Sequence, residues 1–253
     1  MQAIIEVGRI KSRPQDLQIR KSLEDMSKRN KLQKFAEILT YPNVLENFNP
    51  LDPKLLGENG KEVKRKGQWQ DSQFANKAPI TVELACGRGE YSLAMARMHP
   101  HRNFIGVDIK GARIWKGATI ALQEELGNVA FLRTRIEQLE LFFEPGEIDE
   151  LWITFPDPFH AKENRRLTAA PFINRYRKVL KKGGLLNFKT DDPDLFEYSV
   201  RVLQKDPQVN ILYQNEDIYS APLYMPELEI KTYYEKMHLA NQKTIKFLQC
   251  TIH

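Results

Sequence analysis

Short apolar runs alternate with amphipathic segments from Ile80 to the end of the chain. Five of the runs have the length and composition of buried strands, and they read ITVELA, NFIGVD, VAFLR, IDELWITF and LLNFKT. Segments with apolar residues at helical spacing accompany them: EYSLAMARM, ARIWKGATIALQEEL, a short stretch near 136–143, PFINRYRKVLKK and LFEYSVRVLQK. Such alternation makes βαβ units, so we predict a doubly wound α/β fold with a mostly parallel sheet. The final KTIKFLQCTI alternates like a strand, and we expect it to add an antiparallel edge strand.

The first 78 residues have a different pattern. Residues 1–40 contain nine basic and five acidic residues, and Leu32, Phe35 and Leu39 recur at helical spacing. This predicts a basic N-terminal arm followed by a short amphipathic helix. Residues 41–78 are rich in Pro, Gly and polar residues, which predicts a connector with little regular structure. We therefore divide the chain into an N-terminal extension, 1–78, and one α/β domain, 79–253.

Composition narrows the class of protein. The chain has 253 residues, a net charge of +5 and two cysteines, Cys86 and Cys250, which lack the spacing of metal ligands. We expect Cys86 to be a packing residue rather than a nucleophile. No run approaches the ~18 apolar residues of a membrane span, and the N-terminus has no apolar stretch suited to a signal peptide, so we expect a cytoplasmic protein with no membrane partner. A basic face would suit a nucleic acid, although a solvated charged surface would give the same totals.

The segment VELACGRGEYS is expected to form the first strand-to-helix turn, where doubly wound sheets bind ligands. Gly87 and Gly89 allow a tight turn, and Asp108, at the end of the second strand, is placed to bind a ribose hydroxyl pair. A dinucleotide site would carry a third glycine where this chain has Ser92, and Glu83 would repel the pyrophosphate. Glu83 suits the cationic amino group and sulfonium of S-adenosylmethionine better. A surface carboxylate at a strand end is the alternative for Glu83.

The segment PDPFHAKENRRLT follows the fourth predicted strand and therefore faces the same ligand site. Prolines on both sides of Asp157 fix the backbone there, which favours a carboxylate that positions or stabilises a reacting group. Lys162, Arg165 and Arg166 follow closely, and they could contact the phosphates of a nucleic acid. A structural turn with an incidental aspartate is the alternative.

Several segments together resemble the tRNA (guanine-N7)-methyltransferase family: VELACGRGEYSLAMA, NFIGVDIKGARIWKGA, ITFPDPFHAKENRRLT, VLKKGGLLNFKTDDPDLFEYS and KTYYEKM. The resemblance extends from about Ile80 to the C-terminus, and the succession FPDP, RRLT, FKTD, LFEY carries most of its specificity. It implies a Rossmann-like, class I methyltransferase fold without a metal. It also implies methyl transfer from S-adenosylmethionine to N7 of a guanosine in the variable loop of tRNA, at position 46. The chain would act as a monomer or a homodimer.

The resemblance assigns roles to particular residues. Asp157 would be the catalytic residue, between the cofactor and the guanine. The residues implied to bind the cofactor are Glu83, Gly87, Gly89, Asp108, Arg135 and Ile136. The residues implied to bind the tRNA are Lys162, Asp191, Thr232, Tyr233, Tyr234 and Glu235.

The chain departs from the family pattern at four places. Arg135 stands in a TRI triplet where the family usually has an acidic or amide residue, so we expect backbone groups of Arg135 and Ile136 to recognise the adenine. The basic loop after FPDP is shortened, which leaves Lys162 as the best match there. Phe159 replaces a usual Trp and keeps a stacking surface. Asp108 replaces a frequent Glu and keeps the carboxylate with a shorter reach.

Methylation at N7 demands little of the protein. Guanine N7 has an exposed lone pair, so in-line attack on the methyl group needs no prior deprotonation, and positioning should supply most of the rate. Our hypothesis is that Asp157, with Asp191, binds the Watson–Crick edge of guanine or stabilises the positive charge that grows on the purine. Two other functions fit the sequence: methylation of an exocyclic amine, because DPF resembles the D-P-P-[YF] motif, and RNA binding without catalysis.

Overall fold

The computed structural model describes residues 30–253, so most of the predicted basic arm lies outside the described residues. The described helices are α2 (Lys31–Ile38), α3 (Glu90–Met98), α4 (Gly111–Gln123), α5 (Leu139–Phe142), α6 (Ala170–Val179), α7 (Pro193–Gln204) and α8 (Tyr233–Ala240). The described strands are β1 (Val44–Glu46), β2 (Ile80–Leu84), β3 (Asn103–Asp108), β4 (Val129–Arg133), β5 (Ile148–Thr154), β6 (Leu180–Thr190), β7 (Val209–Asn215) and β8 (Lys246–Ile252). None of the described helices is both long and apolar enough to cross a membrane.

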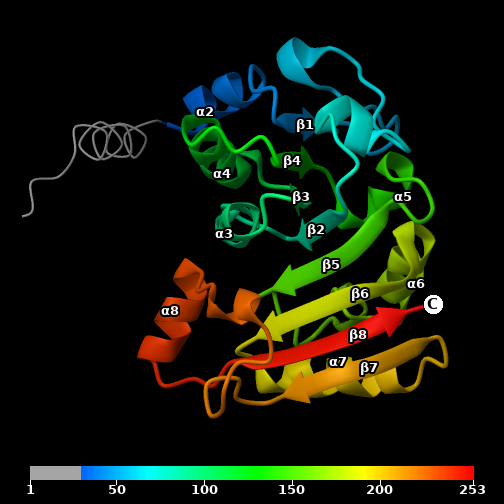
Figure 1. Ribbon diagram of the computed structural model, residues 1–253, viewed down its shortest axis with the longest axis vertical. Helices are drawn as coiled ribbons and strands as arrows, with labels where there is room; N and C mark the ends of the chain where they lie inside the picture. The colour runs from blue at the N-terminus through cyan, green and yellow to red at the C-terminus, as the bar shows by residue number, and fades with distance from the viewer. Residues whose placement is uncertain (1–29) are drawn as a thin grey trace, which may run out of the picture.

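The strands form one sheet in the order β1-β4-β3-β2-β5-β6-β8-β7 (Figure 1). Neighbours from β1 to β6 run parallel, and the strand order reverses between β2 and β5, which confirms the doubly wound fold. β8 is antiparallel to β6, as predicted for the end of the chain. It is not the edge of the sheet, however, because β7 pairs along its outer side. β7 was not predicted, because its residues are only half-buried or exposed and it therefore lacks a strong apolar signal.

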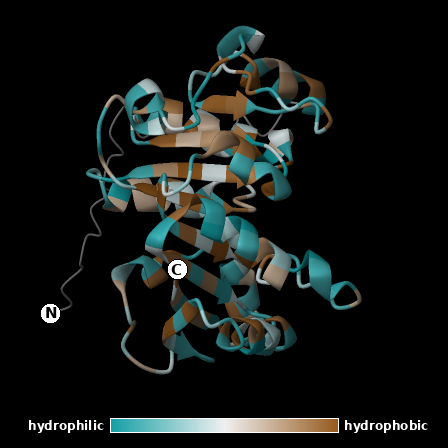
Figure 2. Cartoon of the chain, turned by 90° about the vertical axis from the view of Figure 1, so that its right-hand side faces the viewer, coloured by the Kyte–Doolittle hydropathy of each residue, from teal (hydrophilic) through white to brown (hydrophobic). Residues whose placement is uncertain are grey.

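Helices cover both faces of the parallel part of the sheet, and each face has its own apolar core. Residues of α2, α3 and α4, such as Leu93 and Ile114, share one core with Phe131 of β4. Residues of α6 and α7, such as Phe172 and Leu195, belong to the core on the other face. Figure 2 shows the apolar residues concentrated along the strands. The carboxyl ends of the parallel strands meet at one edge of the sheet, and α8 lies beside that edge (Figure 1).

The described part of the N-terminal extension contributes to this fold. The predicted helix is present as α2. β1 lies in the segment expected to have little regular structure, and it pairs with β4. Trp69 is fully buried, stacks on Phe143 with ring centroids 5.1 Å apart, and donates its indole N–H to the Phe142 carbonyl at 2.8 Å. The segment before Ile80 therefore packs against the α/β core, while the boundary between 78 and 79 stays a prediction.

Candidate active site

The glycine loop connects β2 to α3 through left-handed backbone at three positions, Ala85, Gly87 and Gly89 (φ 58°, 57° and 68°). A Cβ atom at Gly89 would come within 2.5 Å of the Phe131 ring, so this glycine is required by packing. A Cβ atom at Gly87 would meet nothing within 4 Å. Gly87 therefore faces open space, which fits the close approach of a ligand to the loop. Cys86 is buried and burial raises its pKa well above the ordinary value, so it packs here as a thiol, as predicted.

Glu83 lies near the end of β2, and only 5% of it is exposed. Its carboxylate accepts hydrogen bonds from the backbone N–H and the hydroxyl of Ser92, and from the hydroxyl of Thr154 at 2.8 Å. Burial raises the pKa of Glu83 to about 7, and the hydrogen bonds from Ser92 and Thr154 oppose this rise only in part. A cationic group beside the loop would favour the ionised form. Glu83 is thus a buried carboxyl rather than a surface carboxylate.

Asp108 shapes the same loop from the end of β3. One carboxylate oxygen accepts the backbone N–H of Gly87 at 2.9 Å, and the other accepts that of Lys110 at 2.7 Å. The next residue, Ile109, is apolar yet 53% exposed. Ile109 is therefore a candidate for packing against a ring of the cofactor. It was not predicted, although an apolar residue directly after the acidic end of a strand was a signal for it.

Arg135 and Ile136 follow the end of β4, at the start of a short 3-10 turn, Ile136–Gln138. The Arg135 side chain is exposed and Ile136 is half-buried. The register of β3 and β4 pairs Asp108 with Arg133. Arg135 and Ile136, which follow Arg133 closely in the chain, therefore lie near Asp108. This placement fits recognition of an adenine by backbone groups, which stays a prediction.

The FPDP loop begins where β5 ends, beside β2 at the point where the strand order reverses. Phe155 and Phe159 have φ angles of 48° and 43°, an unusual conformation for aromatic residues that brackets the Pro156–Pro158 segment. The Phe155 N–H donates to the Lys189 carbonyl at 2.9 Å. Within residues 30–253 the exposed Asp157 carboxylate has no hydrogen-bond or ion-pair partner, so it is available to a substrate.

Arg166 does not serve the phosphate-binding role that its position in the sequence suggested. It is only 4% exposed, donates from Nε to the Pro158 carbonyl at 2.9 Å, and stacks over the Tyr198 ring at 4.4 Å. Arg166 therefore supports the FPDP loop from behind. Lys162 and Arg165 are exposed and remain candidates for phosphate contacts.

Asp191, one residue after β6, fixes α8 to the sheet. Its carboxylate lies 2.6 Å from the Lys243 ammonium and 3.3 Å from the His238 ring. The His238 ring also stacks on Phe155 of the FPDP loop, with centroids 5.9 Å apart. The contacts of Asp191 within the chain therefore attach α8 and the residues after it to the end of β6. Contact between Asp191 and tRNA stays a prediction.

The four residues at the start of α8 divide into two exposed and two buried side chains. Tyr233 and Tyr234 are 57% and 49% exposed, and the Tyr233 N–H donates to the Glu90 carboxylate at 2.7 Å. Thr232 is buried and caps the helix by accepting the Glu235 N–H at 3.2 Å. Glu235, expected on the tRNA side, is fully buried instead. Only the two tyrosines can present side chains to a large substrate here.

Lys189 is a residue of this site that the sequence analysis missed. It lies near the end of β6, fully buried, with its ammonium 2.8 Å from the Glu235 carboxylate. Burial lowers the pKa of Lys189, and the charge of Glu235 opposes that shift. The lysine stands in the quoted FKTD motif, but no local pattern marks a strand lysine as buried.

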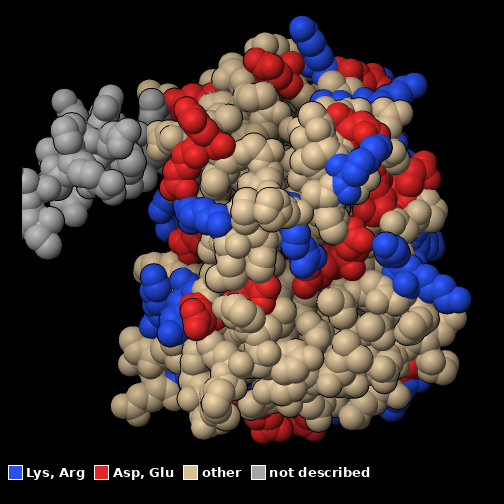
Figure 3. All heavy atoms as spheres, viewed as in Figure 1, with Lys and Arg blue, Asp and Glu red and all other residues tan. Residues whose placement is uncertain are grey.

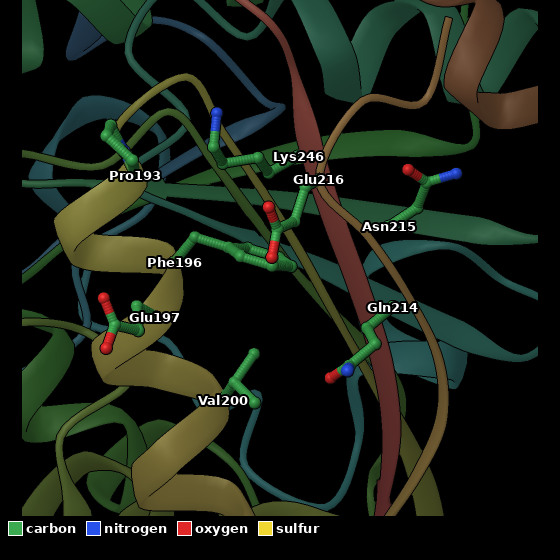
Figure 4. Close-up of a pocket in the computed structure, with 8 residues that line it drawn as sticks. All are labelled: Pro193, Phe196, Glu197, Val200, Gln214, Asn215, Glu216 and Lys246. Carbon is green, nitrogen blue, oxygen red and sulfur yellow. The ribbon is translucent and has the colours of Figure 1, made fainter. Parts of the chain in front are cut away.

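A groove of about 520 Å³ lies between α7 and the adjoining ends of β7 and β8 (Figure 4). It is lined by Pro193, Phe196, Glu197, Val200, Gln214, Asn215, Glu216 and Lys246. None of the predicted site residues lines it, so the candidate chemistry lies at the glycine and FPDP loops.

Comparisons with known proteins give the family of the chain. A family model described as "Putative methyltransferase" matches residues 77–248. The tRNA (guanine-N(7)-)-methyltransferase of Bacteroides thetaiotaomicron is 43% identical over 222 residues, covering 87% of this chain and 85% of that protein. The protein of the same name from Porphyromonas gingivalis is 45% identical over 210 residues, covering 83% and 84%. The one from Christiangramia forsetii is 41% identical over 230 residues, covering 90% and 100%.

Solved structures share the fold at low sequence identity. The 16S rRNA methyltransferase KamB aligns with a TM-score of 0.56 at 13% identity, covering 76% of this chain and 96% of that one. The aminoglycoside resistance methyltransferase NpmB1 aligns with a TM-score of 0.53 at 14% identity, covering 83% and 100%. These likenesses concern the fold alone. Because the family model and the three relatives cover most of its length, the chain belongs to the tRNA (guanine-N7)-methyltransferase family.

Proposed function

We propose that this protein transfers the methyl group of S-adenosylmethionine to N7 of a guanosine in tRNA, and that the guanosine lies in the variable loop. The observation that carries the proposal is the arrangement at the reversal of strand order. There a buried carboxyl, Glu83, is hydrogen-bonded to Thr154. Asp157, which has no partner among the described residues, follows Thr154 by three residues on a loop bracketed by two left-handed phenylalanines. A cofactor site and a substrate site thus share one edge of the sheet.

The residues present fit the cofactor. Open space at Gly87 admits a ligand to the glycine loop, and Asp108 holds that loop while keeping free lone pairs for ribose hydroxyls. Glu83 would bind the cationic amino group, which would stabilise its ionised form. Backbone groups of Arg135 and Ile136 would bind the adenine, with Ile109 packing on the ring.

S-adenosylmethionine, when bound, supplies an electrophilic methyl group on a sulfonium. The chain's residues have to hold guanine N7 in line with that group, because attack by the lone pair needs no proton transfer. As the N7–carbon bond forms, the electron pair of the carbon–sulfur bond stays on sulfur, and positive charge appears on the purine. Asp157 is suited to stabilise that charge because prolines restrict the backbone on both sides of it and none of the residues from 30 to 253 pairs with its carboxylate.

Exposed cations surround the site on the side where tRNA would bind. They are Arg88 in the glycine loop, Lys162 and Arg165 after the FPDP loop, and Lys231, Lys236 and Lys243 around α8. Figure 3 shows Lys and Arg side chains at the left edge of the molecule, where Figure 1 places α8, while the lower part of that face carries few charges. Tyr233, Tyr234 and Phe159 offer surfaces on which an exposed base could stack. We further propose that residues 1–29 contribute to tRNA affinity, and that the enzyme works in the cytoplasm as a monomer or homodimer.

Incubation of the purified protein with S-adenosylmethionine and unmodified tRNA tests the proposal directly. Mass spectrometry of the digested nucleosides should show 7-methylguanosine, and fragment mapping should place it in the variable loop. A nucleoside methylated on an exocyclic amine would instead support the alternative suggested by the DPF sequence. Binding of tRNA without any methylation would refute the proposed reaction.

A further inference from the structure

Lys189 connects the end of β6 to the segment that leads into α8. Its ammonium lies 2.8 and 2.9 Å from the two carboxylate oxygens of Glu235. It also donates hydrogen bonds to the backbone carbonyls of Leu228 at 3.2 Å and Ile230 at 3.1 Å. One side chain from the sheet therefore fixes three points of a segment that is otherwise a surface loop and a short helix.

The partners of Glu235 extend this connection. The Glu235 carboxylate also accepts a hydrogen bond from the Tyr219 hydroxyl at 2.6 Å. The segment is also joined to α3, because the Tyr91 hydroxyl donates to the Glu227 carbonyl at 2.7 Å and the Tyr233 N–H donates to Glu90. The start of α8 is thus held between the sheet, α3 and the glycine loop, where Arg88 lies 5.9 Å from the Tyr233 ring.

Stability alone does not explain a fully buried ion pair at this place. Removing two charges from water costs several kcal/mol, and well-packed apolar residues usually stabilise a fold as well or better. In some proteins such a pair instead specifies a defined geometry, because charged hydrogen bonds with fixed donors and acceptors allow fewer alternative packings. The geometry fixed here is that of the exposed Tyr233 and Tyr234.

We propose that Lys189 is a positioning residue, which acts through Glu235 and the Leu228 and Ile230 carbonyls to hold Tyr233 and Tyr234 where they contact the substrate nucleoside. The inference rests on the proposed methylation of tRNA. It assigns Lys189 no contact with the cofactor or the reacting atoms. Loss of Lys189 therefore reduces the use of tRNA while the affinity for S-adenosylmethionine is retained.

The test compares Lys189→Met with a control at the opposite edge of the sheet. Arg102→Met also breaks an ion pair with a buried carboxylate, Glu150, but at the amino ends of the strands. A third variant, Lys189→Met with Glu235→Met, removes the buried charge that the single substitution would leave unpaired. Each variant is measured for thermal unfolding, for the Kd of S-adenosylmethionine, and for kcat and KM with tRNA.

The expected result is a loss in kcat/KM for tRNA of about 10- to 100-fold in both Lys189 variants, the size that follows from misplaced substrate contacts. The Kd of S-adenosylmethionine stays within about twofold, and Arg102→Met keeps its kcat/KM even where its unfolding temperature falls. Limited trypsin digestion adds a second readout, because cleavage at Lys231, Lys236 and Lys243 should accelerate in the Lys189 variants and not in the control.

Retained kcat/KM in the double variant, or an equal loss in the control, would overturn the inference. An equal weakening of cofactor binding would also overturn it, because it would place Lys189 on the cofactor side. If the unchanged protein forms no 7-methylguanosine, the proposed function fails instead. In that case the digestion pattern still decides whether Lys189 holds the segment, and unchanged cleavage refutes it.

Discussion

Thr154 donates a hydrogen bond of 2.8 Å to Glu83, and this bond joins the carboxyl ends of β5 and β2 where the strand order reverses. Glu83 belongs to the predicted cofactor site, and Thr154 stands three residues before Asp157. The bond therefore fixes the carboxylate of Glu83, which is predicted to bind the cofactor, relative to the FPDP loop that carries Asp157. A reaction that depends on positioning requires such a fixed distance between its two halves.

The raised pKa of Glu83 predicts that the affinity for S-adenosylmethionine depends on pH. The pKa of about 7 in the free protein means that Glu83 is mostly protonated at pH 6 and mostly ionised at pH 8. Since the amino group of the cofactor prefers the ionised form, the Kd should fall by up to about tenfold between pH 6 and pH 8. Titration calorimetry over this range measures the effect. Glu83→Gln should bind weakly with no such dependence, and a similar pH profile in that variant would contradict the assignment.

The raised pKa of Glu83 also makes the unfolding free energy of the free protein depend on pH. Because the folded-state pKa lies above the ordinary value of 4.5, the folded protein binds more protons than the unfolded chain between pH 4.5 and 7. The contribution of Glu83 is therefore fully present below pH 4.5 and is lost as the pH rises through 7, by about 3 kcal/mol. The difference in unfolding free energy between Glu83→Gln and the unchanged protein should shift in favour of the variant as the pH rises.

The sequence predicted the parts of this site that depend on topology. A strand followed by a glycine turn places Glu83 and Gly87 at the carboxyl edge, and the fourth strand carries Asp157 to the same edge, whatever the details of packing. The alternation of runs also predicted each parallel strand from β2 to β6 as well as the direction of β8. These features follow from local pattern and from the rules that connect parallel strands.

The sequence could not predict which charged residues are buried. Arg166 follows Arg165 in a basic stretch, and only the three-dimensional packing shows that it stacks on Tyr198 while its neighbour faces solvent. Glu235 and Lys189 are 46 positions apart, and neither has a local signal for a partner. β1 and β7 were missed for a related reason: one is three residues long, and the other is half-exposed at the edge of the sheet.

The two glycines of the loop should respond differently to the same substitution. In Gly89→Ala the new methyl group would collide with the Phe131 ring, and the left-handed backbone adds strain, for a total cost of about 2 to 5 kcal/mol. In Gly87→Ala only the strain remains, at about 1 kcal/mol, but the methyl group projects into the proposed cofactor site. Thermal unfolding should identify Gly89→Ala as the unstable variant. Calorimetry should identify Gly87→Ala as a stable variant with weakened cofactor binding, and unimpaired binding would move the cofactor away from this loop.

Arg166 and Lys162 should also respond differently to substitution, because Arg166 supports the FPDP loop and Lys162 is predicted to contact tRNA. Arg166→Ala removes the donor to the Pro158 carbonyl and the stacking on Tyr198, so it should cost about 2 to 4 kcal/mol of unfolding free energy. Lys162→Ala should leave the unfolding temperature unchanged, because the side chain is exposed. It should weaken tRNA binding and reduce by about one the slope of log affinity against log salt. A salt slope unchanged in Lys162→Ala would remove it from the tRNA interface.

The sharpest prediction concerns Asp157→Asn. The substitution keeps the size of the side chain and removes only its charge, and the carboxylate has no partner within the described residues whose loss would disturb the fold. If Asp157 stabilises the positive charge that grows on the purine, kcat should fall by about 100- to 1000-fold, the loss typical for removal of one electrostatic contact to a transition state. The Kd of S-adenosylmethionine and the unfolding temperature should both stay unchanged.

The matched control for Asp157 is Asp194→Asn, an exposed aspartate in the first turn of α7 that lies 3.8 Å from His160 of the adjoining loop. It removes the same charge from the carboxyl edge of the sheet and leaves the sequence of residues 155–159 unchanged. If the two variants lose activity equally, the effect is one of general surface charge on tRNA binding. If only Asp157→Asn loses turnover, and the loss is in kcat rather than in KM, the carboxylate acts at the transition state. Full turnover in Asp157→Asn would show that the charge of Asp157 is not needed. The rate would then come from positioning by the FPDP loop alone.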